Sequence, residues 1–149
     1  MDFENSRFPV LLRGAWFGIN RAFREKLKET NSLTPVQYTL LRNLYEGRGQ
    51  ILNQQALSGL LSTNKNNLAD LLNRMEGKKL IKRHDNTKDQ RNKSVSITVS
   101  GEKEFLRARE HALTLQREIL SRFQKNQQDS LMAYFARCND RLEEISRSD

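Results

Sequence analysis

Residues 53–75 read NQQALSGLLSTNKNNLADLLNRM, a stretch that predicts two short helices joined by a tight turn. Asn53 is placed to cap the first helix with its side-chain oxygen. The polar residues 62–64 then separate two apolar series at helical spacing, namely Leu57, Leu60 and Leu61 before the turn and Leu68, Leu71, Leu72 and Met75 after it. Two short helices with such a connection are typical of the helix-turn-helix motif.

The period of the apolar residues changes after Gly77. Residues 80–83, LIKR, and residues 94–99, SVSITV, predict two strands, and the polar run 85–92 joins them as a charged loop. Residues 100–102, SGE, are expected to stop the second strand. A hairpin directly after a helix-turn-helix predicts a winged helix-turn-helix lobe.

The chain before residue 53 predicts two further helices. The first ends near residues 30–32 and carries an unusually aromatic apolar stripe, formed by Leu12, Trp16, Ile19, Phe23 and Leu27. The second is marked by residues 34–37, TPVQ, which combine a capping hydroxyl, a proline at the first helical position and a capping glutamine. It is expected to run to about Glu46, because Gly47 and Gly49 then break the pattern.

Two more helices are expected after residue 101. The apolar face of the first is Phe105, Ala108, Ala112, Leu115, Ile119 and Phe123, and the apolar seam of the second is Leu131, Phe135, Cys138, Leu142 and Ile145. The second series alternates steps of four and three residues and so resembles a coiled-coil heptad. Such a seam needs a partner, and we expect the terminal helices to pack together and against a second copy of the chain.

Positive charge is concentrated in the predicted winged lobe. The chain of 149 residues has a formal net charge of +8. Residues 60–100 hold nine Lys and Arg against four Asp and Glu, and residues 101–149 hold nine of each sign. The lobe therefore carries most of the electrostatic footprint expected of a protein that binds the phosphates of a nucleic acid.

The second helix of the motif offers a polar face to the DNA major groove. Burial of its apolar residues leaves Asn64, Lys65, Asn66, Asn67, Asp70, Asn73 and Arg74 available for contacts. Asparagine can read adenine with two hydrogen bonds, and arginine can bind guanine or a phosphate. The alternative interpretation is an ordinary solvated helix face. Three asparagines in the first turn, where they are poor helix formers, favour the functional interpretation.

Residues 33–102 resemble the MarR (multiple antibiotic resistance regulator) family. The resemblance is carried by LTPVQ at 33–37, NQQAL at 53–57, NRMEGKKLIKR at 73–83 and, most specifically, DQR at 89–91 followed by VSITVSG at 95–101. The last pair resembles the family's wing signature, an Asp-x-Arg followed by an apolar-Thr-x-x-Gly exit. The resemblance implies a triangular homodimer whose two lobes grip a pseudo-palindromic operator in double-stranded DNA. It also implies a repressor that a small aromatic or anionic effector releases.

The resemblance extends to the domain organisation and the wing. It implies a mainly α chain, 1–149, in which 1–32 and 101–149 are dimerisation helices and 33–100 form the DNA-binding lobe. The basic tip of the wing is Lys88, Arg91 and Lys93, and the resemblance implies that Arg91 enters the minor groove while Asp89 orients it or a neighbouring basic side chain. A narrow minor groove concentrates negative potential and favours arginine. The alternative is a surface hairpin kept soluble by its charge.

Two departures from the family pattern bear on the DNA contacts. Ala69 and Asp70 occupy positions where the family often has Thr or Ser followed by Arg or Lys. A carboxylate facing a groove is repelled by phosphates unless it accepts from a cytosine amino group or pairs with Arg74, and the sequence leaves both options open. Lys79 lies where the family usually turns on glycine.

The resemblance also implies a ligand pocket where the first, second and fifth helices meet. Its candidates are Arg13, Trp16, Phe17, Asn20, Tyr38, Leu41, Arg109 and His111, with Arg13 as the expected partner of an anion. Aromatic side chains with a few polar groups are the usual make-up of a small-molecule site. They are also the usual make-up of a core, and both interpretations remain open.

Other classes of function find little support in the sequence. His84, His111 and Cys138 lie far apart, so no metal site, catalytic pair or cofactor is expected, and the chain is not expected to be an enzyme. No signal peptide or membrane-spanning run is visible, and a single cysteine suits a reducing cytoplasm. Two alternatives are a ligand-independent architectural DNA-binding protein and a redox-sensing regulator that uses Cys138. An RNA-binding or protein-interaction module is disfavoured, because residues 60–100 contain no Phe, Tyr or Trp.

Overall fold

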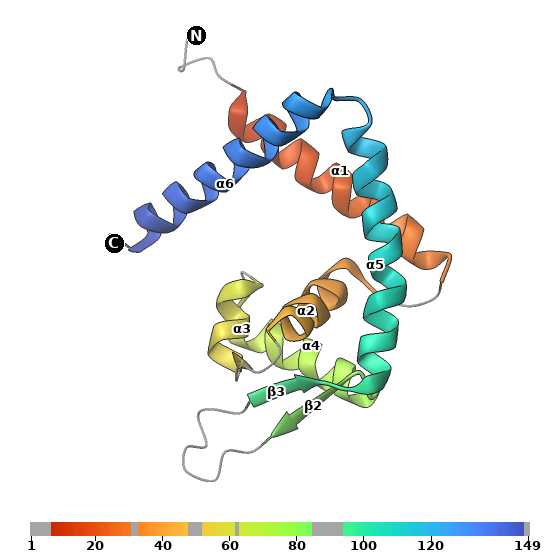
Figure 1. Ribbon diagram of the computed structural model, residues 1–149. Helices are drawn as coiled ribbons and strands as arrows, with labels where there is room; N and C mark the ends of the chain where they lie inside the picture. The colour runs from red at the N-terminus through yellow and green to blue at the C-terminus, as the bar shows by residue number, and fades with distance from the viewer. Residues whose placement is uncertain (1–6, 31–32, 48–51, 62, 85–93, 148–149) are drawn as a thin grey trace. The chain divides into compact units, whose positions relative to one another are not determined.

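The computed structural model describes residues 7–30, 33–47, 52–61, 63–84 and 94–147 (Figure 1). Its elements are α1 (Phe8–Lys28), α2 (Pro35–Glu46), β1 (Leu52–Asn53), α3 (Gln54–Leu60), α4 (Lys65–Gly77), β2 (Ile81–His84), β3 (Ser94–Ile97), α5 (Val99–Leu120) and α6 (Lys125–Arg147). The predicted class, mainly α with a small sheet, is confirmed.

The chain divides into two compact units. The first comprises Met1–Ala112, the second comprises Leu113–Asp149, and the boundary falls within α5. We refer to the first as the N-terminal unit and to the second as the C-terminal unit. The expectation that residues 1–149 form a single domain stays a prediction.

The start of α2 follows the sequence pattern closely. The backbone N–H of Gln37 donates to Oγ1 of Thr34 at 3.3 Å, and the backbone N–H of Thr34 donates to Oε1 of Gln37 at 3.0 Å. This reciprocal capping box satisfies two backbone donors that a helix start otherwise leaves without partners. The helix ends at Glu46 with Gly47 as its C-cap, as predicted.

An aromatic cluster holds α1, α2 and the first half of α5 together in the N-terminal unit. The ring of Tyr38 lies 4.9 Å from that of Phe23 and 5.4 Å from that of Phe105, and the ring of Tyr45 lies 4.8 Å from that of Phe105. Stacked and edge-on ring pairs at these separations add to the stabilisation that burial provides. The rest of this core is leucine-rich and includes Leu27, Leu40, Leu41, Leu44, Leu57, Leu72 and Met75.

The sheet is antiparallel, with β3 between β1 and β2. Ile81 is paired with Ile97 across β2 and β3, and Leu52 is paired with Val95 across β1 and β3. The two strands of the hairpin were predicted. The short β1 was not, because two residues are too few to show a strand period.

The predicted end of the second strand was wrong. The alternating pattern extends to Val99, but β3 ends at Ile97 and α5 begins at Val99. Thr98 causes the change, because its hydroxyl accepts from the backbone N–H of Gly101 at 3.0 Å and donates to the backbone carbonyl of Lys79 at 2.7 Å. Gly101, expected to stop the strand, is therefore a buried residue in the first turn of α5.

The end of α4 has the hydrogen bonds of a Schellman motif. The backbone N–H of Leu80 donates to the carbonyl of Met75 at 3.0 Å, and that of Lys79 donates to the carbonyl of Glu76 at 2.8 Å. This motif needs a left-handed residue after the C-cap, which is usually glycine. Lys79 fills that position with a φ of 58°, the only positive φ at a non-glycine residue among those described.

Lys79→Gly is expected to stabilise the protein by up to about 1 kcal/mol, because glycine adopts the left-handed conformation without the steric cost of a Cβ. The greater freedom of glycine in the unfolded chain offsets part of this gain. Urea denaturation at a fixed protein concentration measures the difference. Lys78→Gly removes the same charge at a residue with a φ of −80°, and we expect it to be destabilising. A lower midpoint for Lys79→Gly than for the native protein would contradict the argument.

Candidate nucleic-acid interface

The turn between α3 and α4 is fixed by local hydrogen bonds. The Ser58 hydroxyl donates to the backbone carbonyl of Thr63 at 2.5 Å, and the backbone N–H of Thr63 donates to the carbonyl of Ser58 at 3.1 Å. Asn53 and Asn64 cap α3 and α4, each accepting through its side-chain oxygen from the backbone N–H three residues later. The start of α4 is thereby set relative to α3, as the helix-turn-helix interpretation requires.

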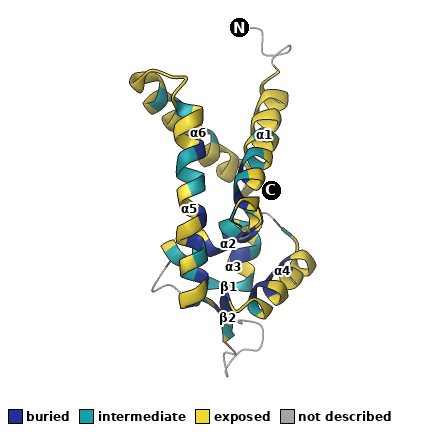
Figure 2. Ribbon diagram, turned by 90° about the vertical axis from the view of Figure 1, so that its right-hand side faces the viewer, coloured by how far each residue is buried: buried dark blue, intermediate teal, exposed yellow. Residues whose placement is uncertain are grey.

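The rotation of α4 about its axis is set by four buried residues, Leu68, Leu71, Leu72 and Met75, none more than 3% exposed. Figure 2 shows the contrast between the buried side of α4 and its exposed side. All of the predicted contact residues within α4 are exposed, namely Lys65, Asn66, Asn67, Asp70, Asn73 and Arg74. The helix therefore presents one continuous polar face to solvent.

Two of the predicted residues make hydrogen bonds within the helix. The Asn64 side chain accepts from the backbone N–H of Asn67 at 2.9 Å, which gives Asn64 a capping role. Nε of Arg74 donates to the backbone carbonyl of Asp70 at 3.3 Å. Because arginine has five N–H donors, this bond leaves four for other partners.

An ion pair joins α4 to the wing strand β2. The guanidinium of Arg83 donates to Oε2 of Glu76 through Nε at 2.8 Å and through Nη2 at 2.5 Å, and the backbone N–H of Arg83 donates to Oε1 at 3.2 Å. Both side chains are partly buried, at 27% and 37% exposure. The contact links α4 to the hairpin, and sequence reasoning missed it.

Glu76→Gln is expected to lower the free energy of unfolding by about 1–2 kcal/mol, because the carboxylate accepts three hydrogen bonds from Arg83 in a partly buried setting. The matched control is Glu25→Gln, whose side chain is 61% exposed and whose partner Lys28 lies within the same helix at 2.8 Å. Pairs of that kind contribute about 0.5 kcal/mol or less. Equal losses for the two variants in thermal or urea unfolding would show that the Glu76–Arg83 contact gives no special support to the wing.

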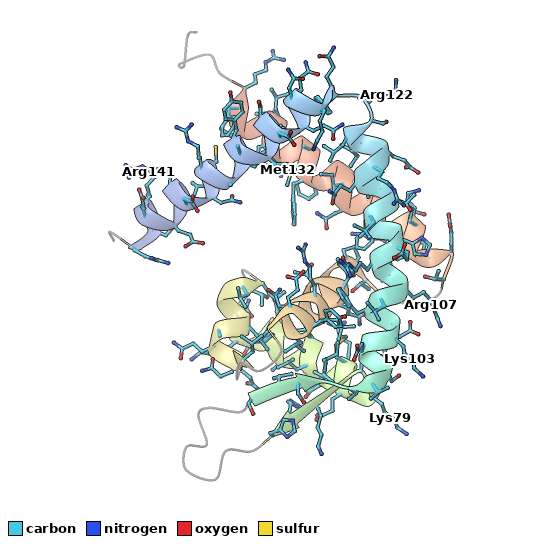
Figure 3. The ribbon with its side chains drawn as sticks, in the orientation of Figure 1. Lys79, Lys103, Arg107, Arg122, Met132 and Arg141 are labelled. Atoms are coloured by element: carbon cyan, nitrogen blue, oxygen red, sulfur yellow. The ribbon has the colours of Figure 1, made fainter. Side chains whose placement is uncertain are left out.

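Further basic side chains are exposed after α4, on β2 and on α5. Lys78 and Lys79, directly after α4, and Lys82, on β2, are exposed. In Figure 3 the side chains of Lys79 and of Lys103, on α5, point away from the ribbon. On the hairpin, His84 Nε2 lies 2.7 Å from the Ser96 hydroxyl. The four predicted wing contacts, Lys88, Asp89, Arg91 and Lys93, lie outside the described residues.

The predicted ligand residues fall into two groups within the N-terminal unit. On α1, the side chains of Trp16 and Phe17 are 64% and 58% exposed. The Arg13 guanidinium lies 5.4 Å from the centre of the Phe17 ring, and the Asn20 side chain donates to the backbone carbonyl of Trp16 at 2.9 Å.

The second group lies on α2 and α5. Leu41 is fully buried, Tyr38 belongs to the aromatic cluster, Arg109 is exposed and His111 is half-buried. Burial raises the pKa of the Tyr38 phenol above its ordinary value, although the nearby positive charges of Arg42 and Arg109 partly oppose this. The Tyr38 hydroxyl is therefore neutral at physiological pH and able to donate a hydrogen bond.

No group of three or more His, Cys, Asp or Glu residues is placed to hold a metal ion within the part of the chain that the structure describes. In the same residues, no helix has the length and apolar character needed to cross a membrane.

Solved structures of other proteins share this fold. MepR of Staphylococcus aureus in complex with DNA has 22% sequence identity and a TM-score of 0.79, and the match covers 89% of this chain and 96% of MepR. The transcriptional repressor CouR bound to a 23-mer DNA duplex has 22% identity and a TM-score of 0.77 over 87% of this chain and 89% of CouR. These likenesses confirm the predicted winged helix-turn-helix fold.

Comparisons of sequence identify the family. A model of the MarR family matches residues 33–93. The transcriptional regulator HosA of Escherichia coli O127:H6 is 31% identical over 104 residues, which cover 70% of this chain and 76% of HosA. Because the match extends over three quarters of a relative at this identity, the chain belongs to the MarR family.

Proposed function

We propose that this MarR-family protein is a homodimeric transcriptional regulator that binds a pseudo-palindromic operator in double-stranded DNA. The observation that carries the proposal is the two-sided character of α4: four apolar side chains are buried on one side, and six polar or charged side chains are exposed on the other. A helix held in this way by a helix-turn-helix can enter the major groove with its polar side toward the base edges. Its capped N-terminus also favours a neighbouring phosphate.

The second copy in the proposed dimer covers the apolar side chains of the terminal helices. No residue of α6 is buried within a single chain. Its exposed apolar residues are Met132, Tyr134, Phe135, Leu142 and Ile145, and those of α1 include Phe8, Val10, Leu11, Trp16 and Phe17. So many large apolar side chains rarely face water unless a partner covers them.

The dimer also suits the operator. Two lobes related by a two-fold axis match two half-sites related by the same symmetry. A second half-site bound within the same complex raises the affinity far above that of one lobe alone. The likeness to MepR and CouR, both solved with bound DNA, supports this mode of binding.

The regulator acts as a repressor, and a small anionic aromatic ligand releases it from DNA. The repressor CouR supports the first part by its likeness in fold. Support for the second comes from α2 and α5, where the neutral Tyr38 hydroxyl lies near the positive charges of Arg42 and Arg109, beside the aromatic cluster. The ring of such a ligand stacks on the aromatic cluster, and its carboxylate pairs with Arg109, because Arg42 is already paired with Glu46 at 2.8 Å.

Capture of fragments of the native genome by the purified protein tests the proposal. We expect enrichment of a small number of fragments that share an inverted repeat, and release of at least one of them by a member of a panel of aromatic acids. Arg109→Ala should weaken the effect of that acid without changing operator affinity. Fragments bound without any shared sequence, with a steep dependence on salt, would instead indicate an architectural DNA-binding protein. Release by oxidant that Cys138→Ser abolishes would indicate redox sensing in place of ligand binding.

A further inference from the structure

We propose that Asp70 reads a cytosine in each operator half-site, its carboxylate accepting a hydrogen bond from the exocyclic N4 amino group in the major groove. The inference rests on the proposed function, since it requires α4 to lie in that groove. It assigns the sequence preference of this protein to an acidic residue on an otherwise basic and polar helix face. It also predicts that the same residue weakens binding to DNA that lacks the cytosine.

The position of Asp70 follows from the burial of α4. Leu68, Leu71 and Met75 lie on the side that packs into the lobe. With a rotation of about 100° per residue, Asp70 falls on the opposite side of the helix. Asn66 and Asn73 lie four residues before it and three after it, so the three side chains follow one another along the outer face. The carboxylate is thus at the centre of the surface that faces the groove.

Arg74 does not form an ion pair with this carboxylate. Its Nε bonds to the backbone carbonyl of Asp70 at 3.3 Å. No ion pair within the described part of the chain includes Asp70, whereas seven other pairs of that kind are present there. The sequence left two partners open for Asp70, and the structure does not pair it with Arg74. Asp70 therefore approaches DNA as an exposed anion.

The donor pattern of the major groove selects the base. An ionised carboxylate only accepts hydrogen bonds, and only adenine and cytosine present an amino donor at this edge. Guanine presents two acceptors, and thymine presents an acceptor and a methyl group. Adenine places its N7 acceptor beside the amino group, where it repels the second carboxylate oxygen. Cytosine has no such acceptor, so it is the base that fits.

The first test compares the sequences that variants select from a random duplex library. Asp70→Asn and Asp70→Ala are compared with the native protein, and Asp140→Asn on α6 is the matched control for loss of one carboxylate. The native protein and the control should select cytosine at one position of each half-site. Asp70→Asn should shift that position to adenine, which asparagine reads with two hydrogen bonds. Asp70→Ala should lose the preference there and bind random duplex several-fold more tightly than the control does.

The outcomes of the selection separate this inference from the proposed function. If the native protein selects no sequence at all, the proposed function fails. If the native protein selects an operator and Asp70→Ala selects the same bases at every position, the proposed function stands and the proposed role of Asp70 is refuted. Asparagine and aspartate have similar helix propensities, and residue 70 is exposed, so Asp70→Asn is expected to fold as the native protein does.

The second test removes the proposed donor from the DNA. The selected cytosine is replaced by 2-pyrimidinone, which lacks the exocyclic amino group. Native affinity should fall about tenfold, a typical discrimination for one well-made base contact. Asp70→Ala should show no such fall, because the variant has no acceptor at that place. An equal fall for both proteins would mean that the weaker base pair, and not a contact with Asp70, causes the loss.

Discussion

Gly101→Ala is expected to destabilise the protein by more than about 3 kcal/mol. A Cβ at residue 101 would lie 2.0 Å from the backbone oxygen of Leu80, 2.9 Å from its carbonyl carbon and 3.0 Å from Cγ1 of Ile97. Backbone atoms cannot yield as the end of a flexible side chain can, and overpacking of this kind is among the mechanisms that give large losses.

The same clash would disturb the junction between α4, the sheet and α5. The Leu80 carbonyl accepts from the backbone N–H of Thr98 at 3.1 Å, and the Thr98 hydroxyl binds both Lys79 and Gly101. Moving Leu80 away from a new methyl group would stretch these bonds at once. The loss of stability should therefore come with a large loss of DNA binding.

Urea denaturation measures the effect, and Gly59→Ala is the matched control. A Cβ at Gly59, in α3, would meet no atom within 4 Å, so that substitution should be neutral or stabilising by about 1 kcal/mol. Native-like midpoints for both variants would show that the junction tolerates a methyl group and that the close approach of Gly101 to Leu80 is unimportant.

The double variant Phe135→Glu, Leu142→Glu is expected to be monomeric and to lose at least about a hundredfold in operator affinity. The two side chains are 40% and 55% exposed in the single chain and lie on one side of α6. Burying two glutamates in an apolar contact between copies costs several kcal/mol. A monomer then binds one half-site without the gain that a linked second lobe provides.

Sedimentation and binding of a labelled operator duplex measure the two effects. Ala133→Glu, Ala136→Glu is the control, since it adds the same charges on exposed residues on the other side of α6. The control should remain dimeric and bind within a few-fold of the native protein. If the Phe135→Glu, Leu142→Glu variant remains a dimer, the contact between copies does not involve this side of α6.

The sequence predicted those parts of the fold that depend on neighbouring residues. Thr34 and Gln37 form the expected capping box, and Asn53 and Asn64 cap the expected helices, because these interactions span only three residues. The outer face of α4 was predicted for the same reason: the helical period alone decides which side chains are buried.

The parts that were missed depend on contacts between elements. Val99 continues an apolar alternation but begins a helix, since Thr98 binds Lys79, which lies nineteen residues earlier. Glu76 and Arg83 lie on a helix and a strand, so no single period relates them. The resemblance to the family's wing signature implies that Arg91 enters the minor groove, and this contact stays a prediction.

The relative affinity for operator and shuffled duplex, measured at one physiological salt concentration, tests the central claim most directly. A specific regulator should bind the selected inverted repeat at least about a thousandfold more tightly than a shuffled duplex of the same composition. The complex should contain two chains per duplex. A ratio near one, or a stoichiometry that grows with the length of the duplex, would contradict a dimeric operator-binding regulator.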